Sequence, residues 1–373
     1  MQEKKIKVLL CSPNNSAAGG ISKWTAHVLT YYDNIKNEVN ISLDHYYVSG
    51  RAIYQGTPLL LRVLYGFKSY IPLIFNFSNK IKYNHYDVTH LATSASISLL
   101  KDIIMLKLAK KYNVRTIIHF RFGRIPDLYN VRKWEQKWLH KVILLADKAV
   151  VIDKYSYDTL VKEGYKNIEL LPNPLTPKIS EIIENNKNII REDLKIIFAG
   201  HVVETKGIFE LIEACKEIEN IKLKMIGYVP SEQVREKLIQ KAGKNSKKWL
   251  EIAGEQNFET TIKEMLSAGV FVLPTYTEGF PNVILESMAC ACPIVASAVG
   301  AIPEMLDIEN GENYGICVKP RNVIQLRESI QRMLNDRIFA INCGLNAQKR
   351  VNELYAMPKV WDRMVNIWES TLK

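Results

Sequence analysis

Short apolar segments alternate with longer helix-like segments along most of the 373-residue chain, and this alternation restricts the fold more than any other feature. The apolar segments are β-branched and bounded by polar or turn residues, as buried strands are. They predict strands at 6–11, 88–91, 115–120, 149–153 and 168–171, and again at 195–199, 223–226, 250–253, 270–273 and 294–296. Helices are predicted between them, for example at 21–32, 98–112 and 133–146. Strands separated by helices form parallel sheets covered on both faces, so the sequence predicts a doubly wound α/β protein.

A segment rich in proline and polar residues separates the two halves. LPNPLTPK at 171–178 supplies three prolines, and a polar stretch follows up to residue 195. Such composition is typical of an interdomain linker, and the length fits two domains of roughly 150 residues. We expect one domain at 1–175 and a second at 190–354. A last helix, 355–373, has a Trp and Met stripe and is expected to pack back on the first domain.

The charge is unevenly divided between the halves. The chain has a net charge of +11, with 27 Lys and Arg against 15 Asp and Glu in residues 1–190, and 23 against 24 in residues 191–373. A basic half predicts an anionic partner for that half. Nucleic acid, anionic lipid and a phosphorylated substrate are all compatible with charge alone.

Several classes of protein are disfavoured by composition. The longest stretch without a charged residue, 287–303, is shorter than the ~20 residues of a spanning helix and contains Pro293 and Gly300. The apolar run near the N-terminus is too short for a secretory leader. The six cysteines form no C-x-x-C pair. We therefore expect a cytoplasmic protein with reduced thiols and no metal site built on cysteine.

Two glutamates bracket a predicted helix start in the segment 270–304. A strand ends at 273–274, Glu278 lies in the following loop, and Glu286 lies more than one turn inside a helix that starts near Pro281. The N–H groups of a helix N-terminus favour an anion or sugar hydroxyls. Two carboxylates there can bind the hydroxyls of a polyol. From the residues alone, a capping Glu278 and a solvated Glu286 are an equally good explanation.

Further residues at the ends of predicted strands are candidates for an anion site. Lys206 precedes a helix in FAGHVVETKGIFEL and can neutralise a diphosphate, while Gly19 and Gly20 can let the backbone approach a phosphate. His119 ends the 115–120 strand, where function concentrates, although a lone histidine there is more often structural. In the next loop, Arg121 and Arg124 meet either an anionic acceptor or solvent.

The motif EGFPNVILE, followed by SMACACPIVAS and VGAIPE, resembles the E-x7-E signature of glycosyltransferase family 4, a retaining group with the GT-B fold. The resemblance extends over 195–320 and is weaker over 1–175. It implies two Rossmann-like domains that face a central cleft. The N-terminal domain would be the acceptor side, and the C-terminal domain would bind the nucleotide-sugar donor.

The resemblance also implies roles for individual residues. Glu286 would bind the ribose of the nucleotide, Glu278 the hydroxyls of the donor sugar, and Lys206 the diphosphate. The remaining donor-site positions implied by the family are Gly279, Phe280, Asn282, His201, Gly19 and Gly20, and His119 would lie near the donor sugar as a catalytic residue. His201 stands where the family usually has Arg. Either His201 is protonated by bound diphosphate, or Lys206 carries the charge alone, or another arginine reaches the site.

The resulting expectation is a retaining hexosyltransferase that moves a sugar from a UDP-sugar to a glycan or lipid-linked acceptor in the biosynthesis of a lipopolysaccharide or capsule. No cofactor and no metal are expected, because D-x-D and H-x-x-x-H are both absent. Two alternatives remain. A nucleotide-sugar 2-epimerase would need additional acid–base carboxylates, and a non-enzymatic basic binder would need a membrane or nucleic-acid surface. No nucleic-acid module motif is present, so nucleic acid is not expected as a partner.

Residues 57–77 form a strongly apolar segment in the basic half, with Arg62 and Lys68 inside it. Pro72 is expected to limit any single helix here. The segment is either a core helix with a loop or an amphipathic element that enters anionic lipid. In the second case, the N-terminal domain would bind peripherally to the inner face of the cell membrane.

Overall fold

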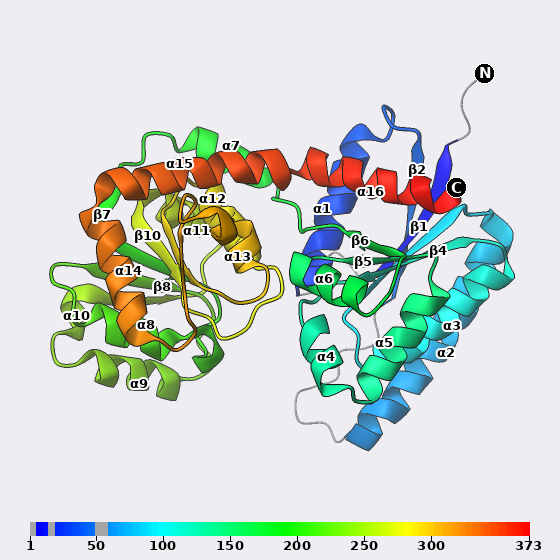
Figure 1. Ribbon diagram of the computed structural model, residues 1–373, viewed down its shortest axis with the longest axis horizontal. Helices are drawn as coiled ribbons and strands as arrows, with labels where there is room; N and C mark the ends of the chain where they lie inside the picture. The colour runs from blue at the N-terminus through cyan, green and yellow to red at the C-terminus, as the bar shows by residue number, and fades with distance from the viewer. Residues whose placement is uncertain (1–4, 14–18, 49–58) are drawn as a thin grey trace. The chain divides into compact units, whose positions relative to one another are not determined.

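The computed structural model describes residues 5–13, 19–48 and 59–373, with side chains for all of these except 59–69. The chain divides into two compact units (Figure 1). Unit 1 comprises Met1–Pro174 together with Val360–Lys373, and unit 2 comprises Leu175–Lys359. The polar segment expected to be a linker contains helix α7 (Lys178–Asn185), which counts with unit 2. Unit 2 therefore starts before residue 190, because this short amphipathic helix buries Ile179 and Ile182.

Unit 1 contains a six-stranded parallel sheet in the order β2-β1-β3-β4-β5-β6. Its strands are β1 (Ile6–Ser12), β2 (Ile41–Tyr47), β3 (Val88–Thr93), β4 (Arg115–Phe120), β5 (Lys148–Val151) and β6 (Ile168–Leu170). Its helices are α1 (Gly20–Ile35), α2 (Leu59–Asn84), α3 (Ser98–Lys111), α4 (Ile125–Val131), α5 (Trp134–Leu145), α6 (Lys154–Lys162) and α16 (Met357–Leu372), of which the last begins just before the unit boundary.

Helices cover both faces of this sheet, as Figure 1 shows. On one face, α2, α3 and α5 enclose an apolar core that includes Leu9, Phe77 and Ile118. On the other face lie α1 and α16, where Trp361 of α16 stacks on Tyr32 of α1 with ring centroids 5.9 Å apart. Alternate residues of each strand point to opposite faces, which divides the buried side chains between the two layers.

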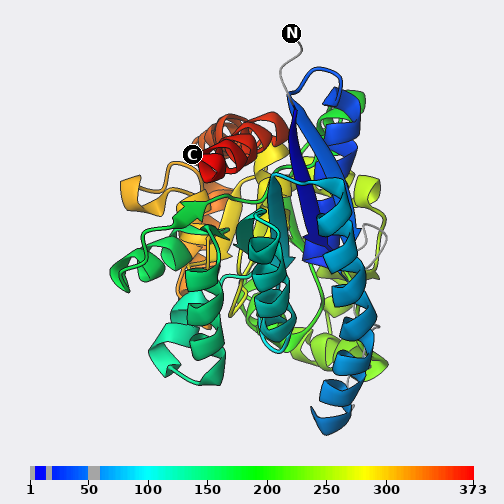
Figure 2. The same ribbon diagram turned by 90° about the vertical axis from the view of Figure 1, so that its right-hand side faces the viewer.

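Helix α2 continues through Pro72, so the prediction that this proline limits the helix is wrong. Figure 2 shows α2 as one long helix beside α3. Leu73, Phe77 and Ile81 recur every four residues and are buried, so packing of this stripe outweighs the helix-breaking tendency of proline. Of the predicted 57–77 segment, residues 57–58 lie outside the described residues. Among the described helices, none is long and apolar enough to cross a membrane.

Unit 2 repeats the design with a six-stranded parallel sheet in the order β12-β11-β10-β7-β8-β9. Its strands are β7 (Glu192–Ala199), β8 (Lys222–Ile226), β9 (Leu250–Gly254), β10 (Ala268–Leu273), β11 (Ile294–Ser297) and β12 (Ile316–Val318). Besides α7, its helices are α8 (Ile208–Cys215), α9 (Glu232–Ala242), α10 (Ser246–Trp249), α11 (Phe258–Ser267), α12 (Asn282–Ala289), α13 (Ile302–Met305), α14 (Val323–Asn335) and α15 (Arg337–Leu354), with 3-10 turns η1 (Glu204–Lys206) and η2 (Ile308–Asn310).

The predicted α/β class with two parallel sheets is confirmed. Two strands escaped prediction, β2 and β12, and both are sheet edges. The edge strand β2 carries Asp44 and His45 among its apolar residues, so it lacks the continuous apolar run of a central strand. The other, β12, has only three residues, too few for a periodic signal.

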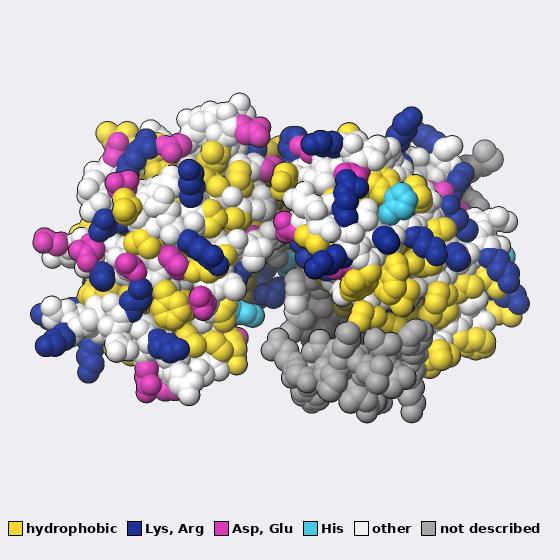
Figure 3. Space-filling view, turned by 60° about the horizontal axis from the view of Figure 1, so that its bottom comes forward, with side chains coloured by type: hydrophobic (Ala, Val, Ile, Leu, Met, Phe, Trp, Pro, Cys, Tyr) yellow, Lys and Arg dark blue, Asp and Glu magenta, His cyan; other side chains and the backbone are white. Residues whose placement is uncertain are grey.

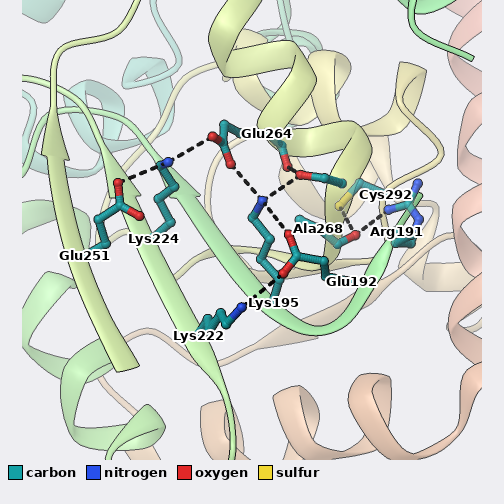
Figure 4. Close-up of polar contacts among 10 residues, drawn as sticks. Arg191, Glu192, Lys195, Lys222, Lys224, Glu251, Glu264, Ala268 and Cys292 are labelled. Carbon is teal, nitrogen blue, oxygen red and sulfur yellow. Dashed lines mark hydrogen bonds and ion pairs between the residues drawn. The ribbon is translucent and has the colours of Figure 1, made fainter. Parts of the chain in front are cut away.

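The amino ends of β7, β8 and β9 are joined by a chain of ion pairs, which Figure 4 shows. Lys195 lies 2.8 Å from Glu264 and 3.2 Å from Glu192, while Lys224 lies 2.9 Å from Glu264 and 3.0 Å from Glu251. A cavity of about 460 Å³ adjoins this network. Because these charges are paired with one another at the amino edge, the network ties strands together on the side opposite to the carboxyl ends, where ligands of such sheets bind.

Candidate active site

The carboxyl end of β7 leads into a tight glycine turn that places Lys206. After Gly200 the chain forms the turn η1 and reaches Gly207, which has φ of +69° and begins α8. A Cβ on Gly207 would lie 2.0 Å from the carbonyl oxygen of Pro274, at the end of β10. Only glycine fits here, both for its backbone angle and for this close approach. The glycine at 207 thus fixes the end of the turn that carries Lys206.

The loop after β10 packs directly on this turn. The amide of Tyr276 donates to the carbonyl of Thr205 over 2.8 Å, and the Thr275 hydroxyl donates to the same carbonyl over 3.3 Å. On its other side, Gly300 approaches so closely that a Cβ would lie 2.3 Å from the carbonyl oxygen of Glu278. These contacts fix the backbone of residues 275–279 between two glycine turns.

This arrangement brings Lys206 and Glu278 into an ion pair, across 72 residues of sequence. Their side chains retain 26% and 14% of their exposure, so a ligand can reach both. An ammonium group has three donors, and Glu278 accepts from it with one oxygen. The pair can therefore bind an anion through Lys206 and a hydroxyl through Glu278 at the same time.

Helix α12 begins directly after this loop. Pro281 occupies its N-cap, and no side chain caps it. Asn282 and Glu286 are four residues apart and share one face of the helix. Phe280 is buried and packs edge-to-face on Tyr355, with centroids 5.6 Å apart, and the Gly279 carbonyl accepts from the amide of Ala301 over 2.9 Å. These two contacts anchor the loop directly before α12.

His201 lies on the surface beside the turn. Its ring meets Tyr228 edge-on, with centroids 6.0 Å apart. Its neighbour Val202 is fully buried, and the Val202 amide donates to the Tyr228 carbonyl over 2.8 Å. The exposed imidazole is therefore accessible, and Lys206 is the cation held directly against Glu278.

Three of the residues that the family resemblance implied, Gly19, Gly20 and His119, belong to unit 1. Gly19, with φ of +127°, is the N-cap of α1, and Gly20 begins that helix. His119 is fully buried on β4, where it lies 3.0 Å from the ring nitrogen of His90. Burial, together with the nearby Arg121 guanidinium and His90, holds the pKa of His119 well below its usual range, so His119 is neutral at pH 7.

Some residues near the site were not found from the sequence. The Tyr276 hydroxyl donates to Glu210 over 2.6 Å, and the Arg321 guanidinium lies 4.3 Å from the centre of the Tyr276 ring. These three residues come from separate elements, so no spacing indicates their contact. Gly300, in the VGAIPE motif, lies close to the Glu278 carbonyl. A glycine after the end of a strand can indicate such a close backbone approach, so this contact had a signal in the sequence.

No metal cluster was found in the described part of the chain, where no three His, Cys, Asp or Glu side chains are placed to hold an ion.

Comparison with known families identifies the second half. Residues 180–350 match the model of the family described as glycosyl transferases group 1, a stretch that contains the Lys206 turn, the Glu278 loop and α12. Residues 180–350 form a glycosyl transferases group 1 domain.

Relatives with assigned names agree with this group 1 domain. The capsular polysaccharide biosynthesis glycosyltransferase CapM of Staphylococcus aureus is 28% identical over 205 residues, covering 51% of each protein. The chain spans about half the length of the curated relatives it matches.

Solved structures resemble the whole chain. The sucrose-phosphate synthase of Thermosynechococcus elongatus has a TM-score of 0.72 at 19% identity, over 98% of this chain and 99% of that one. Anabaena HepE in complex with UDP has a TM-score of 0.71 at 15% identity, over 98% and 100%. These likenesses confirm the predicted GT-B fold around the group 1 domain.

Proposed function

We propose that this protein is a retaining glycosyltransferase that moves a sugar from a UDP-sugar to a glycan or lipid-linked acceptor in cell-surface polysaccharide biosynthesis. The observation that carries the proposal is the Lys206–Glu278 pair, held at the carboxyl edge of the unit 2 sheet beside the start of α12. A cation and a carboxylate in contact suit a ligand that has both phosphate and hydroxyl groups. The names of CapM and of the UDP complex of HepE support a nucleotide-sugar donor and a polysaccharide product.

The proposed reaction is a same-face displacement. The bond between the sugar C1 and the diphosphate oxygen breaks, and a bond from the acceptor oxygen to C1 forms on the same face. The acceptor proton passes to the departing diphosphate. Lys206 and the start of α12 stabilise the negative charge that grows on the leaving group, while Glu278 orients the sugar hydroxyls and Glu286 the ribose.

In this mechanism Lys206 supplies the charge that a metal ion supplies elsewhere, and no cofactor is required. The imidazole of His201 lacks the two parallel N–H donors of a guanidinium, so it cannot take the role of a bidentate arginine. Activity is therefore expected to persist in excess EDTA, and a loss restored by Mg²⁺ or Mn²⁺ would refute metal independence.

Hydrolysis of nucleotide sugars across a donor panel tests the site. Lys206→Ala and Glu286→Ala should each lower kcat/KM by about 10²–10³-fold, the range for loss of a preorganised charge contact. Lys216→Ala and Glu217→Ala remove the same side-chain types from an exposed part of unit 2 and should keep wild-type rates. If Lys206→Ala and Glu286→Ala match wild type on the best donor, the site assignment is wrong. An NMR spectrum of the product separates transfer or hydrolysis from C2 epimerisation.

We also propose that unit 1 binds the cytoplasmic face of an anionic membrane, where a lipid-linked acceptor resides. Large apolar side chains are exposed on three helices that pack in sequence, α2, α3 and α5, namely Ile71, Phe75, Ile104 and Leu144. Lys107, Lys111 and Lys141 are exposed on the same helices. Figure 3 shows hydrophobic side chains gathered on unit 1 with Lys and Arg beside them. Apolar insertion and lysine attraction act together at such a surface.

Flotation with liposomes tests this membrane contact. The double variant Ile71→Ser/Phe75→Ser should lose binding to anionic vesicles, and wild type should bind neutral vesicles far more weakly. The matched control Ile324→Ser/Ile338→Ser changes two equally exposed apolar residues of unit 2 and should bind as wild type does. If wild type binds neither anionic nor neutral vesicles, the proposal is wrong.

A further inference from the structure

A buried polar cluster lies in unit 1 between the sheet and the helices α1 and α16. His90 of β3 and His119 of β4 are diagonal neighbours on one sheet face, since His90 pairs with Ile117 and Ala92 with His119. Trp368 of α16 contacts His90, and Trp24 of α1 contacts His119. Arg121, two residues beyond His119, completes the cluster. All these residues belong to unit 1, whereas Lys206 and Glu278 belong to unit 2.

The position of each proton in the cluster follows from Trp368. An indole nitrogen only donates, and Trp368 Nε1 lies 3.0 Å from His90 Nδ1, so Nδ1 accepts. His90 is neutral, because burial and Arg121 lower its pKa to about 3. Its single proton is therefore on Nε2, which donates to His119 Nδ1 over 3.0 Å. His119 is also neutral, so its proton is on Nε2.

Two donors then face each other. His119 Nε2 lies 3.3 Å from Arg121 Nη1, and a guanidinium has no acceptor. In the alternative arrangement, His119 carries its proton on Nδ1 and His90 carries its proton on Nδ1. The His90 Nδ1 proton would then face the Trp368 indole N–H at 3.0 Å, where both side chains are fully buried. The conflict thus stays at Arg121, whose side chain keeps partial exposure, whereas His90 and Trp368 are fully buried. One oxygen acceptor would satisfy both donors.

The charge of Arg121 has no carboxylate beside it in the described part of the chain. Its other contacts are neutral: Nη2 donates to Asn173 Oδ1 over 2.6 Å, and the guanidinium lies 4.4 Å from the centre of the Trp24 ring. Its Nε is buried and has no partner among the described atoms. Burial lowers the pKa of Arg121 to about 9, so the charge remains at pH 7 but is poorly compensated.

Arg124, three residues later, shows the contrast. It forms an ion pair with Glu135, with one hydrogen bond of 2.9 Å, and lies over the Phe122 ring. Its charge is therefore compensated within the fold. Of the two arginines that the sequence offered for an anionic acceptor, Arg121 is the one whose charge has no carboxylate partner among the described residues.

We propose that Arg121 and His119 form an oxyanion site for the acceptor, which carries a phosphate or carboxylate group that the two residues bind. This inference rests on the proposed transfer function, since it names the chemistry of the acceptor. A bound oxygen would receive the His119 Nε2 proton and the Arg121 guanidinium together, and charge-assisted bonds of this kind are about twice as strong as neutral ones. Trp24 holds the guanidinium plane in place.

Inorganic phosphate is the probe that tests the site, in the full chain with saturating UDP so that the donor site is filled. The fluorescence of Trp24 should change saturably with phosphate, and Trp24→Phe should remove that change. Arg121→Gln should weaken phosphate binding at least tenfold, with UDP affinity within twofold of wild type. The control Lys162→Gln removes an exposed cation of unit 1 and should bind phosphate as wild type does.

The outcomes separate this inference from the proposed function. Equal phosphate binding by wild type and Arg121→Gln overturns the site, whereas failure of UDP to bind wild type counts against the glycosyltransferase. A loss of UDP affinity in Arg121→Gln with phosphate binding kept would assign the arginine to the donor diphosphate, and so would overturn an acceptor site. Should Arg121→Gln fail to fold by circular dichroism, Arg121→Lys keeps the charge but loses the fork, and should weaken phosphate several-fold.

Discussion

At the scale of single residues, a buried ion pair in α3 makes unit 1 sensitive to one substitution. Lys101 Nζ lies 2.7 Å from Asp102 Oδ1, and both side chains are almost fully buried, at 5% and 0% exposure. Neither oxygen of Asp102 has a well-directed hydrogen bond in the part of the chain described. The carboxylate therefore depends on the nearby charge of Lys101.

Lys101→Met should lower the free energy of unfolding by about 3–5 kcal/mol, because it leaves a buried carboxylate without its cation. Urea denaturation followed by tryptophan fluorescence measures this loss. Lys107→Met, on the exposed side of the same helix, should stay within about 0.5 kcal/mol of wild type. Adding Asp102→Leu to Lys101→Met should recover much of the stability. An unchanged urea midpoint for Lys101→Met alone would show that the pair is not needed.

The sequence predicted the candidate residues of the donor site but not their contacts. Lys206 and Glu278 were each singled out from local patterns, a lysine before a helix and a glutamate after a strand. Their pairing depends on β7 and β10 being neighbours, which the order of strands along the chain does not reveal. The same reason hid His90, whose contact with His119 depends on the register of β3 against β4. Local sequence patterns therefore indicate candidate residues, but they do not indicate which strands are neighbours in the sheet.

At the scale of secondary-structure elements, Pro72 inside α2 has a measurable cost. It is exposed and makes no contribution to the buried stripe of Leu73, Phe77 and Ile81. Proline in a helix interior is about 3 kcal/mol less favourable than alanine. Pro72→Ala should therefore raise the free energy of unfolding by about 1–3 kcal/mol in urea. Asn76→Ala, one turn later and exposed, should raise it by no more than about 0.7 kcal/mol. A loss of stability in Pro72→Ala would mean that packing requires the bend that proline introduces.

The ion-pair network between α11 and the strands β7 and β8 should make unit 2 sensitive to acid. Burial raises the pKa of Glu264, but hydrogen bonds and charge from Lys195 and Lys224 outweigh it, so the folded-state pKa is lowered. A lowered pKa gives stability that is present above the unfolded pKa and is lost as pH falls through the folded pKa.

Glu264→Gln should therefore cost about 1–3 kcal/mol at pH 7, the range for hydrogen bonds to charged groups. The difference from wild type should begin to shrink near the ordinary glutamate pKa of about 4.3 and disappear below the lowered folded-state value. Urea melts at a series of pH values measure it, with Glu217→Gln as an exposed control. If the difference in unfolding free energy between wild type and Glu264→Gln does not change with pH, the charge of Glu264 does not stabilise unit 2.

At the scale of the whole molecule, the division into two parallel-sheet units was predictable because each half repeats the strand and helix periods. The uneven charge of the two halves was also predictable, because it follows from the number of charged residues in each half. The return of the chain to unit 1 at Val360 agrees with the expectation that the last helix packs on the first domain. Its individual contacts could not be predicted, because Trp361 and Trp368 meet Tyr32 and His90, residues more than 270 positions away.

This division gives a way to assign each ligand to a unit. Of the six tryptophans, Trp249 alone belongs to unit 2, and the other five, Trp24, Trp134, Trp138, Trp361 and Trp368, belong to unit 1. A variant that keeps only Trp249 reports unfolding of unit 2, and a Trp249→Phe variant reports unit 1. UDP at a hundred times its Kd should stabilise the Trp249 signal by about 2.7 kcal/mol, because the proposed donor site lies in folded unit 2. Phosphate added to the UDP-bound protein should stabilise the unit 1 signal instead. If UDP raised the unit 1 transition and left the Trp249 transition in place, the donor would bind through unit 1, contrary to the roles assigned to Lys206, Glu278 and Glu286.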